Sequence, residues 1–435
     1  MRIVEINMTN FGSTGKIMLQ IAEMVNSNHG SAICCVPSSR VNKKNKQENQ
    51  VFIGTILTRQ IHRYLARYTG FQDCFSIIAT IRFLKHITKY KPDLIHLHNI
   101  HGNYINLPML FHYIKKYNIP VIWTLHDCWS FTGQCPYFTM VKCSKWQTGC
   151  YECPQTNIYP SSYVDRTRTM WKLKKKWFEG VENLIIVTPS HWLANLVKKS
   201  YLKNYDVRVI HNGIDLKVFH PTFSDFREKY NIGMLKKIVL GVAFDWGERK
   251  GLDIFIKLSQ ELDEEKYQIV LIGTDEIIDK GLPRNIISIH RTHNQTQLAE
   301  IYTVADIFVN PTREENYPTV NMEAIACGTP VITFNTGGSP ESVEENTGLV
   351  IPCDDFELLK LSIKKICELE IFSERDCVES AVKFDKNKNG IMEDDEKLEE
   401  QAYIRYLAEK DDEGEEDDDF DNNYVRDFHQ DHYLL

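Results

Sequence analysis

Long uninterrupted apolar runs are missing from this 435-residue sequence. A membrane-spanning helix needs about 20 consecutive apolar residues, and no segment meets that requirement. The N-terminal stretch MRIVEINM also lacks the apolar region and the small-residue cleavage site of a signal peptide, and it is instead typical of a first β-strand. We therefore expect a cytoplasmic protein.

Two common nucleotide-binding fingerprints are absent as well. The stretch NFGSTGK follows the first predicted strand, but Gly12 and Gly15 do not form the G-x-G-x-x-G pattern of dinucleotide-binding domains. Lys16 does not complete a P-loop either, because the spacing between the glycines is wrong. Gly12 and Gly15 still allow the backbone to approach a phosphate at a helix N-terminus, so both are candidate ligand-binding residues.

Charge is distributed unevenly along the chain. The formal net charge is −8, yet residues 393–421 alone contain sixteen Asp and Glu against three Lys and Arg. Residues 393–435 together have a net charge of −14, which leaves residues 1–392 near +6. A mildly basic body fits either ordinary solubility or peripheral contact with an anionic membrane, and we expect the acidic segment to be solvated.

Short β-branched runs alternate with longer amphipathic segments in two series. The runs are MRIVEINM, SAICCVP, DLIHLHN, PVIWTLHD, NLIIVTPS and VRVIHNG, and then KKIVLGVA, YQIVLIG, NIISIHR, ADIFVNPT and TPVITFNTGG. This alternation predicts an α/β protein with two doubly wound, parallel, Rossmann-like domains that face a cleft. A turn signal at Asn212 predicts domains over 1–211 and 212–384, followed by an acidic C-terminal extension over 385–435.

The segment REENYPTVNMEAIACGTPV contains two glutamates eight positions apart. Pro318 suits the first turn of a helix and Gly328 suits its end, so Glu323 lies about one turn inside a short helix while Glu315 precedes it. A helix N-terminus between two carboxylates could bind a phosphate that bears hydroxylated groups. A capped surface helix with ordinary acidic residues is the alternative.

Cations and further glycines follow other strands of the second series. WGERKG supplies Arg249 and Lys250, and NTGGSPE supplies Gly337 and Gly338. Cations, glycines and a helix N-terminus at corresponding strand ends favour a ligand that carries a pyrophosphate.

The ordered motifs FGSTGK, HLHN, TLHD, HNGID, ERKG, PTREENYPTVNMEAIACGTPV, GGSPE and TGLVIP resemble glycosyltransferase family 4 over about residues 1–385. The resemblance implies the GT-B fold, a nucleotide-diphosphate sugar bound by the C-terminal domain and an acceptor bound by the N-terminal one. It also implies retention of anomeric configuration without a catalytic metal. The sequence around Glu315 is similar to that of enzymes that assemble capsule, exopolysaccharide or O-antigen on a lipid carrier.

The resemblance also implies roles for single residues. Glu315 would bind hydroxyls of the transferred sugar and Glu323 would bind the ribose. Arg249 and Lys250 would neutralise the leaving diphosphate, although Asp245 stands where many members have an arginine. The diphosphate would also accept from backbone amides; because Pro318 has none, we assign these contacts to Tyr317, Thr319 and Val320.

Histidines occur at two predicted strand ends. His126 of TLHD resembles a histidine that faces the reacting sugar, with a core histidine beside Asp127 as the alternative. His96 and His98 alternate along HLHN, and we interpret that strand as structural, without a catalytic role for either histidine.

A cysteine-rich insertion over 128–155 contains Cys135, Cys143, Cys150 and Cys153, which end in a C-x2-C pair. Four thiolates of this kind fit a tetrahedral structural zinc site, and a loop without a core benefits from a metal. Two disulfides or four free thiols are the alternatives. Because the insertion follows TLHD, we expect it on the acceptor side.

Two further segments are less decisive. RTRTMWKLKKKWF predicts either a cationic, aromatic helix suited to anionic lipid headgroups or a helix whose aromatic side chains pack inward. DKNKNGIMEDDE fits the EF-hand formula, but a single acidic, Asn-rich match can arise by chance. Its calcium ligands would be Asp385, Asn387, Asn389 and Glu396.

The sequence thus predicts a retaining glycosyltransferase that moves a sugar from a nucleotide-diphosphate donor to a lipid-linked or other glycan acceptor in cell-surface polysaccharide synthesis, in the cytoplasm and peripherally at the membrane's inner face. No nucleic-acid partner is expected. A sugar-nucleotide epimerase of the same fold is one alternative, and a non-catalytic calcium-responsive scaffold is another.

Overall fold

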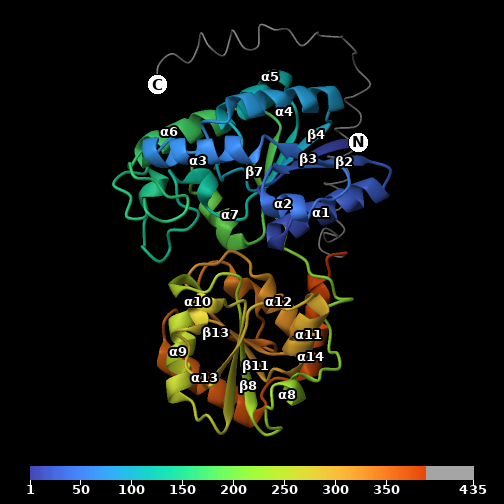
Figure 1. The fold of residues 1–435 in the computed structure, drawn as a ribbon, viewed down its shortest axis with the longest axis vertical. Coiled ribbons are helices and arrows are strands. Elements are labelled where there is room, and N and C mark those ends of the chain that lie inside the picture. Colours follow the sequence, from blue (N-terminus) through green and yellow to red (C-terminus); the bar gives the residue numbers. More distant parts are fainter. Residues whose placement is uncertain (388–435) are drawn as a thin grey trace. The chain divides into compact units, whose positions relative to one another are not determined.

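A computed structural model describes residues 1–387, which contain two parallel β-sheets (Figure 1). No helix within residues 1–387 is both long and apolar enough to cross a membrane. Asn389, Glu396 and the acidic segment of the predicted extension lie outside the described residues.

The first sheet has seven strands in the order β3-β2-β1-β4-β5-β6-β7. Its strands are β1 (Arg2–Ile6), β2 (Ser31–Pro37), β3 (Gln50–Ile53), β4 (Leu94–Leu97), β5 (Val121–Thr124), β6 (Leu184–Thr188) and β7 (Asp206–Val209). The helices between them are α1 (Gly12–Ser27), α2 (Arg40–Lys44), α3 (Ile56–Thr69), α4 (Ile77–Tyr90), α5 (Leu107–Tyr117), α6 (Thr167–Phe178) and α7 (His191–Val197). Every neighbouring pair of strands is parallel, as the alternation of strands and helices predicts.

The second sheet has six strands in the order β10-β9-β8-β11-β12-β13. Its strands are β8 (Lys237–Val242), β9 (Tyr267–Ile272), β10 (Ile286–Ile289), β11 (Ile307–Asn310), β12 (Val331–Phe334) and β13 (Gly348–Ile351). Its helices are α8 (Phe226–Lys229), α9 (Leu252–Glu261), α10 (Glu276–Asp279), α11 (Gln295–Val304), α12 (Thr319–Ala326), α13 (Phe356–Leu369) and α14 (Glu374–Ala381).

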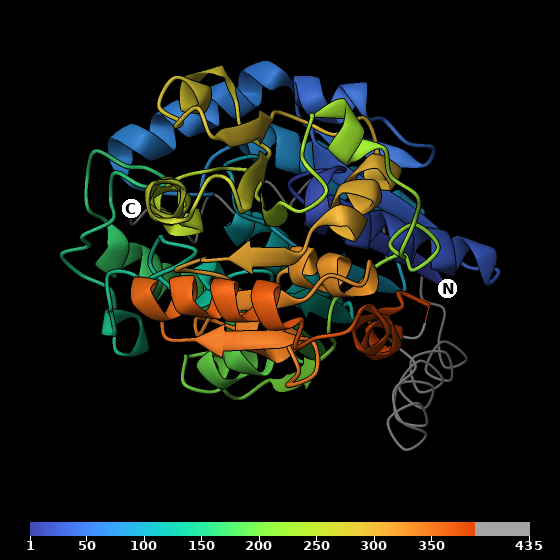
Figure 2. The same ribbon diagram turned by 90° about the horizontal axis from the view of Figure 1, so that it is seen from below.

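Alternating strand residues divide the core of the second sheet into two layers. Ile238 and Leu240 of β8 pack with residues of α11, α12 and α14, whereas Val239 packs on the opposite face with α9 and α13. Figure 2 shows the yellow and orange strands of this sheet with helices on both sides. Because both faces are covered, the strands are apolar at nearly every position, as buried parallel sheets are.

These two sheets confirm the predicted α/β class with two Rossmann-like parts. Two edge strands, β3 and β13, were not among the predicted strands.

After β7 the chain continues into the second part, where the last described residues pair with it. The Ile214 backbone N–H donates to Phe384 O at 2.8 Å, and its carbonyl accepts from the Lys386 N–H at 2.9 Å. In the predicted calcium loop, Asp385 Oδ1 accepts from the Asn387 backbone N–H at 3.0 Å.

The cysteine-rich insertion contains only two short 3-10 turns, η1 (Trp129–Phe131) and η2 (Lys145–Gln147). The expectation that it has no core is wrong. The rings of Phe131, Phe138 and Trp146 pack together, with centroids of Trp146 at 5.2 Å from Phe131 and 5.1 Å from Phe138. Aromatic pairs at this separation stabilise the loop beyond their area of burial.

Helix α6 corrects the prediction of an exposed cationic, aromatic helix. Trp171, Phe178 and Lys174 are all buried, and the Trp171 indole donates to Trp146 O at 2.8 Å. The aromatic side of the helix therefore packs inward against the insertion, and only the alternative interpretation survives.

Candidate functional site

Helix α12 begins at Thr319, and Pro318 is the residue that caps it. As predicted, Glu315 precedes the helix and Glu323 lies about one turn inside it. Because the first backbone N–H groups of a helix have no acceptor within it, the amides of Thr319 and Val320 are directed out of the helix toward any anion at this end.

Lys250 forms an ion pair with Glu315, which lies four residues before the start of α12 at Thr319. Lys250 ends the short η3 turn (Glu248–Lys250), so the ERKG segment meets the segment that contains Glu315 and Glu323 in space. Burial alone would raise the pKa of the Glu315 carboxyl, but the Lys250 charge and hydrogen bond, together with the Arg249 charge, lower that pKa below its usual value. Glu315 is therefore ionised at neutral pH and balances one of the two cations.

The cysteine-rich insertion also reaches this helix end. The Met140 backbone N–H donates to Glu314 Oε1 at 2.9 Å, and Thr139 Oγ1 donates to the same oxygen at 3.2 Å. Arg249 donates to Glu314 O at 3.1 Å, and its guanidinium lies 5.5 Å from the centre of the Tyr137 ring. The expectation that the insertion serves the acceptor side alone is therefore wrong.

Gly337 and Gly338 allow two loops to approach each other closely. A Cβ on Gly337 would lie 1.7 Å from Glu315 O, and one on Gly338 would lie 2.2 Å from Asn316 O. Side chains there would displace the Glu315 loop. The structure thus gives these glycines a packing role next to the predicted ligand, whereas Gly12, at φ +70° and with nothing within 4 Å, leaves open space at the start of α1.

Glu323 has a different environment from Glu315. Its carboxylate accepts from the Tyr302 hydroxyl at 3.3 Å. Burial raises the pKa of Glu323, although the Lys16 charge and the hydrogen bonds from Tyr302 and Thr319 act in the opposite direction. A carboxylate with spare acceptor capacity at this place can accept hydrogen bonds from two hydroxyl groups of a ribose.

The ring of Tyr317, another predicted site residue, stacks on the ring of His211, with centroids 4.6 Å apart.

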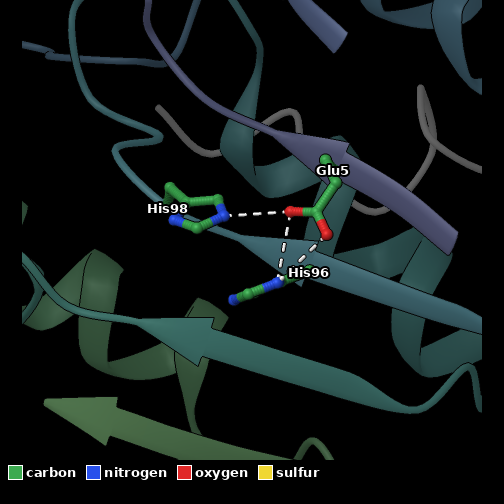
Figure 3. Close-up of side chains that lie close together, drawn as sticks. All are labelled: Glu5, His96 and His98. Atoms are coloured by element: carbon green, nitrogen blue, oxygen red, sulfur yellow. Dashed lines mark hydrogen bonds and ion pairs between the residues drawn. The ribbon is translucent and has the colours of Figure 1, made fainter. Parts of the chain in front are cut away.

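A buried network of one carboxylate and three imidazoles extends through the first sheet. Glu5 of β1 accepts from His96 Nδ1 at 3.2 Å and from His98 Nε2 at 2.9 Å (Figure 3). His98 Nδ1 lies 3.1 Å from His126 Nε2, and His96 Nε2 lies 2.8 Å from Thr124 Oγ1. This network is linked to the loop before α12, because Asn316, the residue after Glu315, donates to His126 O at 3.1 Å.

The network fixes which nitrogen of each ring carries a proton. Burial alone would raise the pKa of Glu5, but the His96 charge and the hydrogen bonds from His96 and His98 lower it to about 2, so Glu5 is an acceptor only. Burial lowers the pKa of His98 to about 4 and that of His126 well below 6.5. Neutral His98 thus donates from Nε2 and accepts at Nδ1, which makes His126 protonated at Nε2 and leaves its Nδ1 as an acceptor.

Glu5 and His98 are functional candidates that the sequence interpretation missed. His98 was assigned a structural role, yet it contacts His126 directly. The available signal was an acidic residue within the apolar run of the first strand, opposite the H-x-H pattern on its neighbour: Glu5 pairs with His96 in the β1–β4 register. An ionisable residue inside an apolar strand needs a partner, and alternate residues of the adjacent strand supply it.

Two groups of residues in the described part of the chain could hold a metal by distance alone. They are Glu5 with His96 and His98, and His191 with His211 and Glu341. In both groups the carboxylate is already occupied: Glu5 accepts from both imidazoles, and Glu341 accepts from the backbone N–H groups of His191 and Trp192 at 2.8 Å each. Hydrogen bonding accounts for both arrangements without an ion.

Two family models match this chain. The description of the first is Glycosyltransferase Family 4, over residues 23–218, and that of the second is Glycosyl transferases group 1, over residues 223–388. The two matches cover nearly all of both sheets. The chain belongs to glycosyltransferase family 4.

Relatives and solved structures agree with this family. A colanic acid biosynthesis glycosyl transferase, WcaC of Escherichia coli, is 25% identical over 293 residues, which are 64% of this chain and 68% of WcaC. For several other curated relatives the match spans about half of the relative's length. Sucrose-phosphate synthase of Thermosynechococcus elongatus superposes with a TM-score of 0.68 and 19% identity, covering 94% of this chain and 99% of that one. HepE of Anabaena in complex with UDP superposes with a TM-score of 0.63 and 14% identity, covering 94% of this chain and 100% of HepE. The two superpositions establish the GT-B fold of this family 4 enzyme.

Proposed function

We propose that this family 4 enzyme transfers a sugar, with retention of configuration, from a nucleoside-diphosphate sugar to a lipid-linked glycan during cell-surface polysaccharide synthesis. The observation that carries the proposal is the meeting of Lys250, Glu315 and the α12 N-terminus. Cations and helix amides at one place suit a diphosphate, and an adjacent ionised carboxylate suits sugar hydroxyls. HepE is described in complexes with UDP and UDP-glucose, and WcaC is described as a colanic acid enzyme.

On the donor side, Lys250 and Arg249 neutralise the diphosphate as it leaves. The bond between the anomeric carbon and the diphosphate oxygen breaks, the acceptor hydroxyl oxygen forms the new bond, and its proton passes to the anionic diphosphate. Charge develops on the leaving group, so cations fixed there stabilise the transition state more than the ground state. The Tyr317, Thr319 and Val320 amides assist, while Glu323 binds the ribose and Glu315 the sugar.

On the opposite side, His126 faces the transferred sugar. With Nε2 protonated toward His98, its Nδ1 accepts a hydrogen bond from a sugar hydroxyl. Glu5 and His98 act as positioning residues, because they determine the tautomer and the ring orientation of His126 without touching substrate. Gly12 allows the backbone at the start of α1 to approach the donor phosphates, and Gly15 supports this loop by packing against Asn10, whose backbone C would lie 2.7 Å from a Cβ there.

Peripheral contact with an anionic membrane fits helix α3 better than α6. One side of α3 exposes a stripe of apolar and aromatic residues with spacings of three and four: Leu57, Ile61, Tyr64, Leu65 and Tyr68. The helix contains Arg59, Arg63 and Arg67 and no acidic residue. Apolar groups flanked by arginine suit anionic headgroups. Vesicles of anionic lipid should bind wild-type protein more tightly than Leu57→Ser/Tyr64→Ser, and equal binding would contradict this assignment.

The experiment that tests the proposed function combines donor and acceptor. Purified protein is incubated with UDP-, GDP- and ADP-sugars, with and without a lipid-diphosphate glycan, and the products are examined by NMR. The proposal predicts a new glycosidic bond with the donor's anomeric configuration, only when acceptor is present. Conversion of the donor without acceptor would instead identify an epimerase, and inverted configuration would contradict the retaining mechanism.

A further inference from the structure

Four cysteines of the insertion line one small cavity. Cys135, Cys143, Cys150 and Cys153 surround it together with Phe138, Lys145 and Trp146. All four are free thiols, and 17 residues of chain lie between the first and the last. We propose that these four cysteines bind one structural zinc ion, a site that is independent of the proposed function.

Backbone amides already donate to two of the sulfur atoms. The Gly133 N–H donates to Cys150 Sγ at 3.1 Å, and the Gln155 N–H donates to Cys153 Sγ two residues earlier in the chain. The thiols of Cys135 and Cys153 lie within hydrogen-bonding reach of each other. N–H groups directed at sulfur suit a metal-bound thiolate, which accepts such hydrogen bonds.

Positive charge is also placed beside the cavity. Four thiolates and one Zn²⁺ have a net charge of −2, which a buried site must balance. Lys174 is fully buried, interacts electrostatically with Asp73 and then with Cys150 and Cys135, and donates to Thr132 O at 2.9 Å. Within residues 1–387 no carboxylate forms an ion pair with it. Lys145 lies on the other side and donates to the carbonyls of Tyr151 and Glu152 at 3.1 Å each.

Metal binding requires a local rearrangement of the cysteine side chains. Among the described residues no three of the four sulfur atoms lie within 4.8 Å of one another. A tetrahedral zinc with Zn–S distances of about 2.3 Å needs sulfur atoms roughly 3.7 Å apart. The loop contains no strand or long helix, so rotation of cysteine side chains around the shared cavity can bring the four ligands together.

The site would be structural, because four protein ligands leave no open position for water or substrate. Its effect on function would pass through the loop itself. Met140 and Thr139 hold Glu314, next to the donor-side Glu315. Zinc therefore keeps this segment in place. The segment contacts Glu314 on the donor side, and it begins shortly after His126 in the sequence.

Full-length protein purified under reducing conditions without chelator tests the proposal directly. Elemental analysis should find about one zinc per chain, and zinc-edge X-ray absorption should show four sulfur neighbours at about 2.3 Å. Zinc well below one equivalent would overturn the proposal, whether thiol titration then finds four free thiols or two disulfides. A nitrogen and oxygen shell would also overturn it, since it would assign the ion to one of the histidine groups.

Matched variants extend the test beyond metal content. Cys150→Ser and Cys153→Ser should lose most of the zinc and lower Tm by roughly 5–10 °C, while the exposed Cys353→Ser should keep both. Equal zinc content in all three variants would contradict the assignment. If the two loop variants fail to fold, the wild-type absorption spectrum still decides.

Discussion

The donor side and the histidine side of the candidate site are organised differently. On the proposed donor side, Lys250 lies on a 3-10 turn and Glu315 on a loop, and the two neutralise each other. On the histidine side, Glu5 and His98 are mounted on or directly after neighbouring strands and satisfy each other permanently. Groups on loops can exchange partners with a charged ligand, whereas a closed network inside a sheet can only orient what it touches. Substitutions on the two sides should therefore change different quantities.

Glu315→Gln should give the largest effect, because we propose that its carboxylate binds the sugar rather than the nucleotide. We expect the transfer rate to fall about 100- to 1,000-fold, as for loss of one transition-state contact. Affinity for the free nucleoside diphosphate should stay the same or rise, since Lys250 no longer has a competing partner. Calorimetry and initial rates measure both quantities, with the exposed Glu345→Gln as control. Lost nucleotide affinity would show that the role of Glu315 is wrong.

Glu5→Gln sharpens the contrast between the sides. Glutamine replaces one carboxylate oxygen by a donor NH2 group, and with that group facing His98 Nε2, His98 and then His126 should change tautomer. We expect transfer to fall roughly 10- to 100-fold with nucleotide affinity unchanged, as for loss of an acid–base or orienting contact. Nitrogen-15 NMR should show a protonated Nε2 on His126 in the wild type and in the control Glu23→Gln, but not in Glu5→Gln. An unprotonated Nε2 in the wild type would contradict the network.

Glu323→Ala should have a smaller effect, confined to donor binding. Loss of one charged hydrogen-bond acceptor for the ribose should weaken binding of the free diphosphate about tenfold, which corresponds to about 1.4 kcal/mol. The exposed Glu276→Ala on helix α10 serves as the control. Unchanged affinity in Glu323→Ala would remove the ribose role.

The pH dependence of stability should report the buried histidines. Burial lowers the pKa of His62 to about 3 and that of His98 to about 4, both below the ordinary 6.5. Between the folded and unfolded pKa values the unfolded chain binds protons that the folded chain does not. The contribution of the two neutral histidines to the free energy of unfolding is therefore fully present above pH 6.5 and is lost as pH falls toward 4. Tm should decrease over this window by a few degrees, less steeply in His62→Gln and unchanged in slope in the exposed His29→Gln. A flat Tm in the wild type would contradict the buried, neutral histidines.

Local patterns predicted the fold well, because each buried strand is a short β-branched run followed by an amphipathic helix. The two strands that were missed, β3 and β13, lie at sheet edges and have four residues each. An edge strand has one partner and a half-exposed face, so its apolar signal is weak. The C-terminal strand β13 also begins with Gly348, a residue that argues against a strand.

The candidate site was predictable only in part. Glu315, Glu323 and Lys250 lie in motifs that are continuous in sequence, and the roles assigned to them stay predictions. The contact of His98 with His126 depends on the register of β1, β4 and β5, which sequence spacing does not specify. The reach of Met140 to Glu314 spans 174 residues and depends on how the insertion folds. Such long-range contacts follow from tertiary packing rather than from local pattern.

Calorimetric titration with nucleoside diphosphates tests the central claim most directly. Wild-type protein and Lys250→Ala are each titrated with UDP, GDP, ADP, CDP and dTDP, with the exposed Lys257→Ala as control. The account predicts that one diphosphate binds the wild type and the control, and that Lys250→Ala weakens this binding at least about tenfold. Failure of all five diphosphates to bind the wild type, or equal binding by Lys250→Ala, would contradict a diphosphate site built around Lys250 and the α12 N-terminus.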